Sequence, residues 1–242
     1  MKKKRILAFF LAAASCLSLA VGVSAANAVR KAADFRDFDR TAWYAEAVST
    51  GVDNGLLYGK SATTLDPDGD LTRAEMAAVI NRSFGCYKEA DISRYKDVVK
   101  SKWYYNDIAL AVQMGTYNGR SASAMMPDAP ITRQEAMTVV ARALELDYTA
   151  YADTDLSKFA DAKDISTWAL PYIRAMVGAG YIRGRGKVLA PQDNITRAEF
   201  AQIFYNIIGT YITAKGSYDK DIKGSVLIRT DEVTFQNMTV DG

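Results

Sequence analysis

The sequence contains no histidine and very little cysteine. The absence of histidine excludes Ser-His-Asp and Cys-His catalysis, histidine-based zinc sites and histidine acid–base chemistry near neutral pH. Cys16 lies in an N-terminal apolar run, so loss of that run would leave Cys86 without an intrachain disulfide partner. Cys86 follows a predicted helix, and we expect it to be buried as a small apolar residue rather than reactive. The sequence therefore suggests no catalytic residue, no metal site and no cofactor.

The N-terminus has the pattern of a signal peptide. Residues 2–5 are basic, residues 6–23 are apolar or small, and Val23-Ser24-Ala25 fits the small-x-small cleavage pattern. We predict a signal peptide over residues 1–25; a cut after Ala28 and an uncleaved membrane anchor are the alternatives. We therefore expect an exported protein that has no membrane partner after cleavage.

Cleavage changes the charge balance of the chain. The full sequence has 30 basic and 28 acidic side chains, and loss of the four basic residues 2–5 would leave 26 against 28, a net charge of about −2. A globally basic nucleic-acid binder is excluded as the default interpretation. Anion binding by this chain would have to come from local geometry.

The sequence repeats itself three times with a period of about 60–65 residues. Thr-Arg-x-Glu occurs three times, and a tryptophan precedes its threonine by 28 or 29 residues each time. The other landmarks also keep their order: an aromatic-x-Asp (Phe35/Asp37, Tyr95/Asp97, Phe159/Asp161), two glycines four apart (Gly55/Gly59, Gly115/Gly119, Gly180/Gly184) and an apolar residue two before proline (Leu65/Pro67, Met125/Pro127, Leu189/Pro191).

Each repeat is predicted to be a helix, a loop and a second helix. Thr41, Ser101 and Thr167 are the expected N-caps of the first helices, which should end near the first glycine in a left-handed residue. The second helix starts after the motif threonine and carries one apolar stripe. Because a single pair of this size cannot bury its apolar face, an all-α fold in which the three repeats pack around a shared axis is predicted.

The C-terminal segment has a different pattern. Residues 211–224 have the polar composition of a linker. Residues 225–242 alternate apolar and polar positions and predict two short strands without an obvious partner in the chain.

The repeated motif combines a familiar cap with an unusual cation. Thr-x-x-Glu is a capping box, so Glu75, Glu135 and Glu199 are predicted to be structural. Arg73, Arg133 and Arg197 occupy the first helical position, where the helix dipole makes a cation unfavourable by about 0.3–1 kcal/mol. A guanidinium beside free helix N–H groups can receive a carboxylate or phosphate. The alternative is an ion pair of each arginine with Asp37, Asp97 or Asp161.

The repeated tryptophans and loop glycines each have two explanations. Trp43, Trp103 and Trp168 either pack in the core or present a stacking face to a sugar ring. Gly59, Gly119 and Gly184 either meet a demand of loop geometry or let a ligand approach the backbone.

This order of motifs resembles the S-layer homology (SLH) domain, and three tandem copies behind a signal peptide are the usual layout of that family. The resemblance covers roughly residues 34–210. It implies a three-pronged helical spindle that binds secondary cell-wall polysaccharide, typically pyruvylated, on the peptidoglycan of Gram-positive-type bacteria. We divide the chain into SLH repeats at 34–86, 94–148 and 158–213, and a segment at 214–242 with a linker and short strands that resemble the start of a β-helix.

The resemblance also implies a set of ligand-binding residues in grooves between neighbouring prongs. They are the motif arginines Arg73, Arg133 and Arg197, the acids Asp37, Asp97 and Asp161, the glycines Gly59, Gly119 and Gly184, and, as stacking faces, Trp43, Trp103 and Trp168. Gln134 replaces the usual alanine of the motif, and the third repeat has one extra residue between Asp161 and Trp168. We therefore expect the three grooves to bind unequally.

Two functions from different classes fit these observations. The first is non-covalent anchoring of an exported, non-enzymatic protein to the cell wall or S-layer. The alternative is the N-terminal anchor of an envelope polysaccharide-degrading enzyme whose catalytic domain is absent from this chain. A calcium loop at residues 66–70 is disfavoured, because the distal glutamate of an EF-hand is missing and the pattern does not recur. Whether the protein self-assembles stays open.

Overall fold

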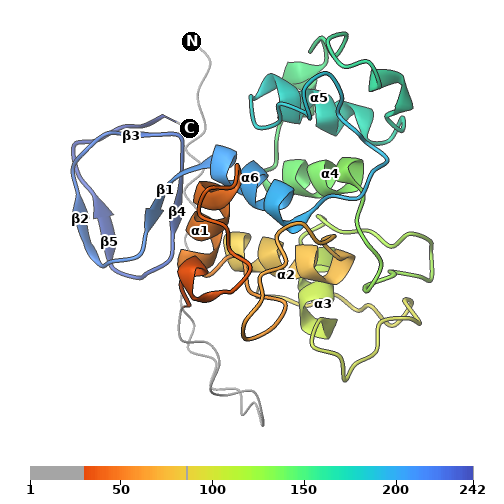
Figure 1. Ribbon diagram of the computed structural model, residues 1–242, viewed down its shortest axis with the longest axis horizontal. Coiled ribbons are helices and arrows are strands. Elements are labelled where there is room, and N and C mark those ends of the chain that lie inside the picture. Colours follow the sequence, from red (N-terminus) through yellow and green to blue (C-terminus); the bar gives the residue numbers. More distant parts are fainter. Residues whose placement is uncertain (1–29, 86, 242) are drawn as a thin grey trace. The chain divides into compact units, whose positions relative to one another are not determined.

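The structure is a computed structural model that describes residues 30–85 and 87–241. The predicted signal peptide and Cys86 lie outside the described residues. Two compact units are present, one formed by Asp68–Ile203 and the other by Met1–Pro67 together with Phe204–Gly242 (Figure 1). The described part is mostly helical and ends in a short strand segment, as predicted.

The helices of the Asp68–Ile203 unit pair across repeat boundaries. The second helix of repeat one, α2 (Arg73–Phe84), packs on the first helix of repeat two, α3 (Tyr105–Gln113). In the same way α4 (Arg133–Ala143) packs on α5 (Leu170–Gly178), as Figure 1 shows. Ile108 and Ile173 are completely buried, so each first helix contributes an apolar face to the core.

The other helices complete the repeat pattern. Helix α1 (Ala45–Asp53) is the first helix of repeat one and contacts the short 3-10 helix at Ala32–Asp34. Helix α6 (Arg197–Ile207) is the second helix of repeat three. Two more 3-10 turns occur at Tyr148–Tyr151 and Ala162–Asp164.

The predicted capping boxes are confirmed at the second helices. The Glu75 N–H donates to Thr72 Oγ1 at 3.2 Å, and the Glu75 carboxylate accepts from the Thr72 N–H at 3.0 Å. The same reciprocal pair joins Thr132 to Glu135 and Thr196 to Glu199. These bonds satisfy N–H groups that would otherwise lack a partner at the helix start.

The predicted caps of the first helices are wrong. Helices α1, α3 and α5 begin after Tyr44, Tyr104 and Ala169, and none of these residues caps its helix through a side chain. Thr41, Ser101 and Thr167 lie in turns that precede the helices. Each of these turns carries the repeat's tryptophan, and the helix begins two residues after it.

Three backbone hydrogen bonds close a ring between the repeats, which we call the central ring. Leu71 N donates to Ile195 O at 3.0 Å, Ile195 N to Ile131 O at 3.1 Å, and Ile131 N to Leu71 O at 3.0 Å. All three residues are completely buried and immediately precede the capping threonines. Each repeat therefore donates to one neighbour and accepts from the other, so the three helix starts are held in equivalent environments.

The second glycine of each repeat is required because a side chain at that position would clash with its surroundings. A Cβ on Gly119 would lie 2.4 Å from the Tyr95 ring and 2.6 Å from the Ser121 carbonyl oxygen, closer than real atoms approach. The same clash arises at Gly59 with Phe35 and at Gly184 with Phe159. The first glycine of repeat two, Gly115, is instead required by its left-handed backbone, with φ at 71°, and has open space around it.

The C-terminal segment forms two stacked coils of parallel strands. Strand β1 (Ile208–Ile212) pairs with β4 (Ser225–Ile228), β2 (Gly216–Tyr218) with β5 (Val233–Phe235), and β3 (Ile222–Lys223) with β6 (Val240–Asp241). Figure 1 shows the three pairs as sides of one coiled ribbon. The prediction of short strands within residues 225–242 is confirmed, although the segment forms three strands rather than two.

The predicted linker at residues 211–224 is wrong, as is the prediction that the strands lack a partner. Residues 208–223 form the first coil, on which the second coil stacks in parallel register. Its strands are only two to five residues long, so their apolar pattern is too short to recognise by alternation. Ile212, Val226 and Ile228 form the buried core of this segment.

Among the described residues, no helix has both the length and the apolar character that crossing a membrane would require.

We predict that Gly119→Ala destabilises the protein by about 2–3 kcal/mol, because the added methyl group meets a buried ring and a backbone carbonyl. Gly115→Ala is the matched control, since it adds the same methyl group in open space and costs only about 1–2 kcal/mol for the left-handed backbone. Urea denaturation of both variants measures the difference. Equal losses would show that the close approach to Tyr95 does not constrain the loop.

Candidate functional site

The motif arginines are buried and pair with the capping glutamates of other repeats. Arg73 Nη1 lies 3.2 Å from Glu135 Oε1, with the arginine side chain only 5% exposed. Arg133 lies 3.0 Å from Glu199, and Arg197 lies 3.3 Å from Glu75. The three ion pairs run in one direction and close a cycle, as the hydrogen bonds of the central ring do.

Every nitrogen of the Arg73 guanidinium has a partner within the protein. Its Nε donates to the Met125 carbonyl oxygen at 2.8 Å, and its Nη2 donates to the Asn118 carbonyl oxygen at 2.8 Å. The guanidinium also lies 5.0 Å from the centre of the Tyr117 ring, and the Tyr117 hydroxyl donates to the Arg73 carbonyl oxygen at 2.7 Å. Arg73 therefore ties the loop of repeat two to the helix start of repeat one.

The ion-pair alternative predicted from the sequence had the right kind of bond but named another acid. Each motif arginine pairs with a glutamate that also belongs to a capping box. A glutamate in this position thus holds a helix start and neutralises a neighbouring cation. The signal for this pairing was present in the sequence, since the arginine and the glutamate always occur in the same motif.

The three motif aspartates brace the loop before each proline. Asp97 accepts from the N–H groups of Met125 at 2.9 Å and Met126 at 2.6 Å, and Met126 has a left-handed φ of 56°. Asp37 and Asp161 make the same two bonds in their repeats, at 2.7 to 2.8 Å. A carboxylate that accepts two N–H groups stabilises a backbone conformation that is unfavourable for a side-chain-bearing residue.

The three tryptophans are exposed. Trp43 is 63% exposed, Trp103 62% and Trp168 49%. Packing in the core therefore does not account for them, whereas the neighbouring Tyr44 and Tyr104 are buried. Exposed indole rings at equivalent positions are free to stack on a ligand.

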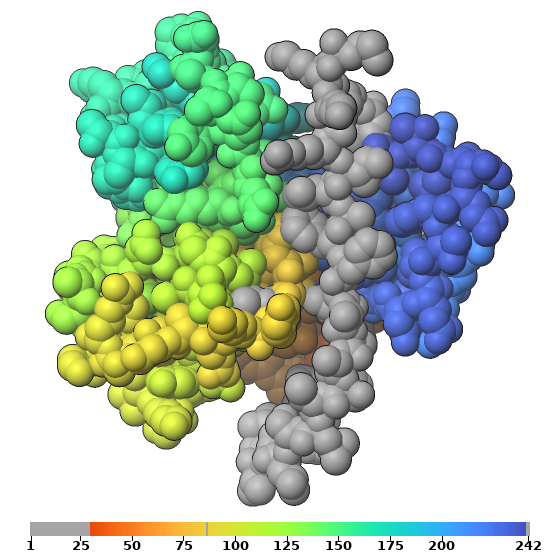
Figure 2. All heavy atoms as spheres, turned by 180° about the vertical axis from the view of Figure 1, so that it is seen from behind, coloured from red at the N-terminus to blue at the C-terminus, as the bar shows by residue number. Residues whose placement is uncertain are grey.

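One cavity brings residues of all three repeats together within the Asp68–Ile203 unit. Its volume is about 440 Å³, and we call it the Trp168 groove. Arg73, Gly119 and Trp168, each predicted as a ligand-binding residue, line it. The full lining is Arg73, Thr116, Tyr117, Asn118, Gly119, Arg120, Glu135, Thr138, Val139, Arg142 and Trp168. Figure 2 shows the atoms of repeats two and three, yellow-green through cyan, side by side.

Two cations of this groove were not predicted from the sequence. Arg120 Nη2 lies 3.0 Å from Glu135 Oε2 and also donates to the Pro130 carbonyl oxygen. Arg142 lies on the face of α4 that lines the groove. Arg120 had a sequence signal, because a cation follows the second glycine in every repeat, as Lys60, Arg120 and Arg185. Arg142 lies outside the motifs that recur in all three repeats, so the sequence did not single it out.

The post-glycine arginine of repeat three is held more tightly. Arg185 contacts Glu199 through two nitrogens, at 2.6 and 2.9 Å, and Asp193 at 2.8 Å. Burial raises the pKa of Glu199, but the hydrogen bonds from Arg185 and the charge of Arg133 outweigh it and leave this pKa below its usual value. Ala129 stands in repeat two where Asp193 stands in repeat three.

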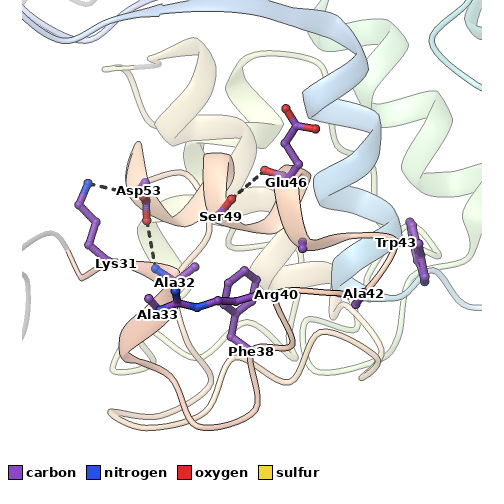
Figure 3. A pocket seen from close by; sticks show the side chains of 11 residues that line it. Lys31, Ala32, Ala33, Phe38, Arg40, Ala42, Trp43, Glu46, Ser49 and Asp53 are labelled. Atoms are coloured by element: carbon purple, nitrogen blue, oxygen red, sulfur yellow. Dashed lines mark hydrogen bonds and ion pairs between the residues drawn. The ribbon is translucent and has the colours of Figure 1, made fainter.

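A second, more open cavity of about 690 Å³ lies beside α1 in the other unit (Figure 3). Asp53 accepts from the Ala32 N–H at 3.0 Å and lies 3.5 Å from Lys31 Nζ. Trp43 stands apart from these groups, as Figure 3 shows, while Arg40 reaches past Phe38. The polar groups on the Asp53 side are engaged with one another, so the Trp168 groove is the better candidate site.

We predict that Arg185→Gln lowers the stability of the protein at neutral pH by about 1 kcal/mol or less, as expected of a partly exposed pair. A depressed carboxyl pKa contributes stability above its unfolded value, near 4.5, and loses that contribution as the pH falls through the folded value. The stability of the variant should therefore fall less steeply below about pH 4.5.

Urea denaturation at about pH 7 and pH 3.5 checks this. Lys215→Gln, in the exposed pair with Asp231, serves as the control and should change little. An acid dependence identical to that of the unmodified protein would contradict the role of Arg185.

A scan against protein-family models identifies three S-layer homology domains, at residues 34–77, 94–137 and 158–201. The chain is also similar to the surface-layer 125 kDa protein of Lysinibacillus sphaericus, with 36% identity over 205 residues, 83% of this chain and 17% of that protein. The exoglucanase XynX of Acetivibrio thermocellus is 30% identical over 183 residues, 74% of this chain and 17% of the relative.

A cellulosome-anchoring protein of Acetivibrio thermocellus is 32% identical over 157 residues, 62% of this chain and 34% of that protein. The chain thus spans between 17% and 34% of the length of these relatives. These matches confirm the resemblance predicted from the motifs and agree with a cell-surface, cell-wall-associated location. With three matched repeats that include all three Thr-Arg-x-Glu motifs, the chain belongs to the S-layer homology domain family.

Proposed function

We propose that this protein anchors itself non-covalently to the bacterial cell wall by binding pyruvylated secondary cell-wall polysaccharide. The Trp168 groove carries the proposal, because it joins an exposed indole, a close-packed glycine loop and three guanidinium groups in one cavity. The ligand-binding set comprises the motif arginines, aspartates, tryptophans and second glycines of the three repeats.

The groove has the two features that an acidic sugar requires. The face of Trp168 offers an apolar platform for the C–H groups of a sugar ring. The guanidinium groups offer paired N–H donors in the planar arrangement that matches a carboxylate, and a pyruvyl ketal supplies that carboxylate. Three arginines face one glutamate in the lining, so the groove favours an anionic ligand even though the predicted mature chain has a negative net charge.

The motif aspartates and arginines act mainly by positioning in this proposal. Asp97 fixes the loop that carries Met125, and Arg73 bonds to that loop's carbonyl oxygen. Both therefore set the shape of the groove wall. The finer fold proposal, a three-pronged spindle with pseudo-threefold symmetry, is supported by the cyclic hydrogen bonds among Leu71, Ile131 and Ile195.

Wall anchoring also fits the runner-up function. Exoglucanase XynX is one of the relatives that share this region, and the chain covers 17% of it. The same module would then hold a polysaccharide-degrading enzyme at the cell surface, with catalysis outside the chain described here. Both versions make the same prediction for the groove.

We predict that the mature protein sediments with purified cell-wall sacculi, and that acid treatment that strips secondary polymers from the sacculi abolishes binding. Trp168→Ala should weaken binding several-fold to about tenfold, because the platform for the sugar ring is lost. The side chain is half-exposed, so the variant should keep the fold. Urea denaturation of the variant tests that expectation.

Tyr87→Ala is the matched control, since it removes an aromatic side chain that is 96% exposed and lies outside the groove. Its binding should equal that of the unmodified protein. Sedimentation that persists on stripped sacculi, or that is indifferent to Trp168→Ala, would show that the module attaches to something other than an acidic wall polymer through this groove.

A further inference from the structure

Arg73 has little left to offer a ligand. Its side chain is 5% exposed, and its three nitrogens already donate to the Met125 carbonyl, the Glu135 carboxylate and the Asn118 carbonyl. A ligand carboxylate would have to break a buried ion pair to gain a direct bond with it, and an unpaired buried charge is strongly unfavourable. A less engaged cation of the Trp168 groove is therefore better placed to contact an anion.

Arg142 is the lining cation that is not neutralised by a carboxylate. Its guanidinium lies 4.9 Å from the centre of the Tyr172 ring of α5. When the side-chain oxygen of Asn118 faces Arg142, both ends of the amide have a hydrogen-bond partner. The amide nitrogen donates to the Tyr117 carbonyl oxygen, and the amide oxygen accepts from Arg142 Nη1 at 3.2 Å. No carboxylate lies within ion-pair distance of Arg142 in the part of the chain that the structure describes. A stacked guanidinium is held in orientation while its outer N–H groups stay available.

The equivalent positions in the other repeats lack this arrangement. Arg82 occupies the same helical position in repeat one. Burial raises the pKa of the nearby Asp107 carboxyl, and the positive charge of Arg82 opposes that rise. Tyr172 stands in repeat three where Asp107 stands in repeat two, so Arg142 meets a ring instead of an acid. Repeat three carries Asn206 at the arginine position.

Arg120, the second cation of the groove, also makes fewer contacts with carboxylates than Arg185, its counterpart in repeat three. Arg120 makes one contact to Glu135, whereas Arg185 makes two contacts to Glu199 and a third to Asp193. The Trp168 groove therefore holds unneutralised positive charge, while the residues around Arg185 balance theirs. This charge difference gives a physical basis for unequal grooves.

We propose that Arg142, stacked on Tyr172 and assisted by Arg120, is the residue that contacts the anionic group of the ligand in the Trp168 groove. Arg73 is then a positioning residue that shapes the wall. The inference rests on the proposed function for the identity of the ligand, an acidic saccharide, but it assigns the contact to a residue outside the family motif.

The test uses a methyl hexoside that carries a pyruvyl ketal, together with its uncharged methyl ester. The probe is titrated into the mature protein while the indole N–H resonance of Trp168 is followed by NMR and assigned by its loss in Trp168→Phe. The acidic probe should shift this resonance and the ester should bind much more weakly. Arg142→Gln should weaken binding of the acid about tenfold or more, as expected for loss of a charge-assisted hydrogen bond.

Arg82→Gln is the matched control at the same helical position and should leave the Trp168 titration unchanged. A Trp168 resonance that responds equally in Arg142→Gln, or that never responds to the acidic probe, overturns the proposal. The sedimentation assay with sacculi separates the proposed wall anchoring from the proposed role of Arg142. Sacculus binding without any effect of Arg142→Gln on the titration retains wall anchoring and rejects Arg142. An Arg142-dependent titration without sacculus binding retains the anion site and rejects wall anchoring.

Discussion

The buried arginine–glutamate pair between repeats is the interaction on which the rest of the arrangement depends. Arg73 at a helix start is unfavourable in its own helix, because the dipole there is positive. Glu135, whose carboxylate already serves a capping box, compensates that cation from the neighbouring repeat. Removing either partner of such a buried pair typically costs about 3–5 kcal/mol. The pair thus makes each helix start depend on the adjacent repeat, and the cycle makes all three depend on one another.

This dependence also explains where the candidate site lies. The loop that ends at Met125 is held by Asp97 from within its repeat and by Arg73 from the preceding one. Gly119 lets the same loop pack against the Tyr95 ring without a clash. A groove wall held from two sides changes little when a ligand arrives, so less conformational entropy is lost on binding. The motif residues therefore serve binding mainly by fixing the wall on which other side chains act.

The sequence predicted the parts of the fold that depend on local chemistry. The capping boxes, the helix ends at Gly115 and its counterparts and the threefold repeat are local patterns, and they were recoverable. The starts of the first helices were not, because Ser101 lies in a turn that is closed by local backbone hydrogen bonds, and the helix begins only after Tyr104. The strand pairing of residues 208–223 was missed because parallel pairing joins segments about 17 residues apart, which alternation within one segment cannot reveal.

The candidate site likewise has residues that the sequence could predict and residues that it could not. Arg73, Gly119 and Trp168 belong to repeated motifs, so the sequence named them, although their roles differ: one is buried and paired, one is small, and one is exposed. Arg142 stacks on Tyr172, a residue of another repeat, and no pattern within either segment couples the two. Repetition preserves the scaffold, while the substitution of Tyr172 for an acid at one position changes the charge of one groove. A threefold scaffold can therefore carry unequal sites, because the residues that build the wall repeat, whereas the pairing of Arg142 with Tyr172 does not.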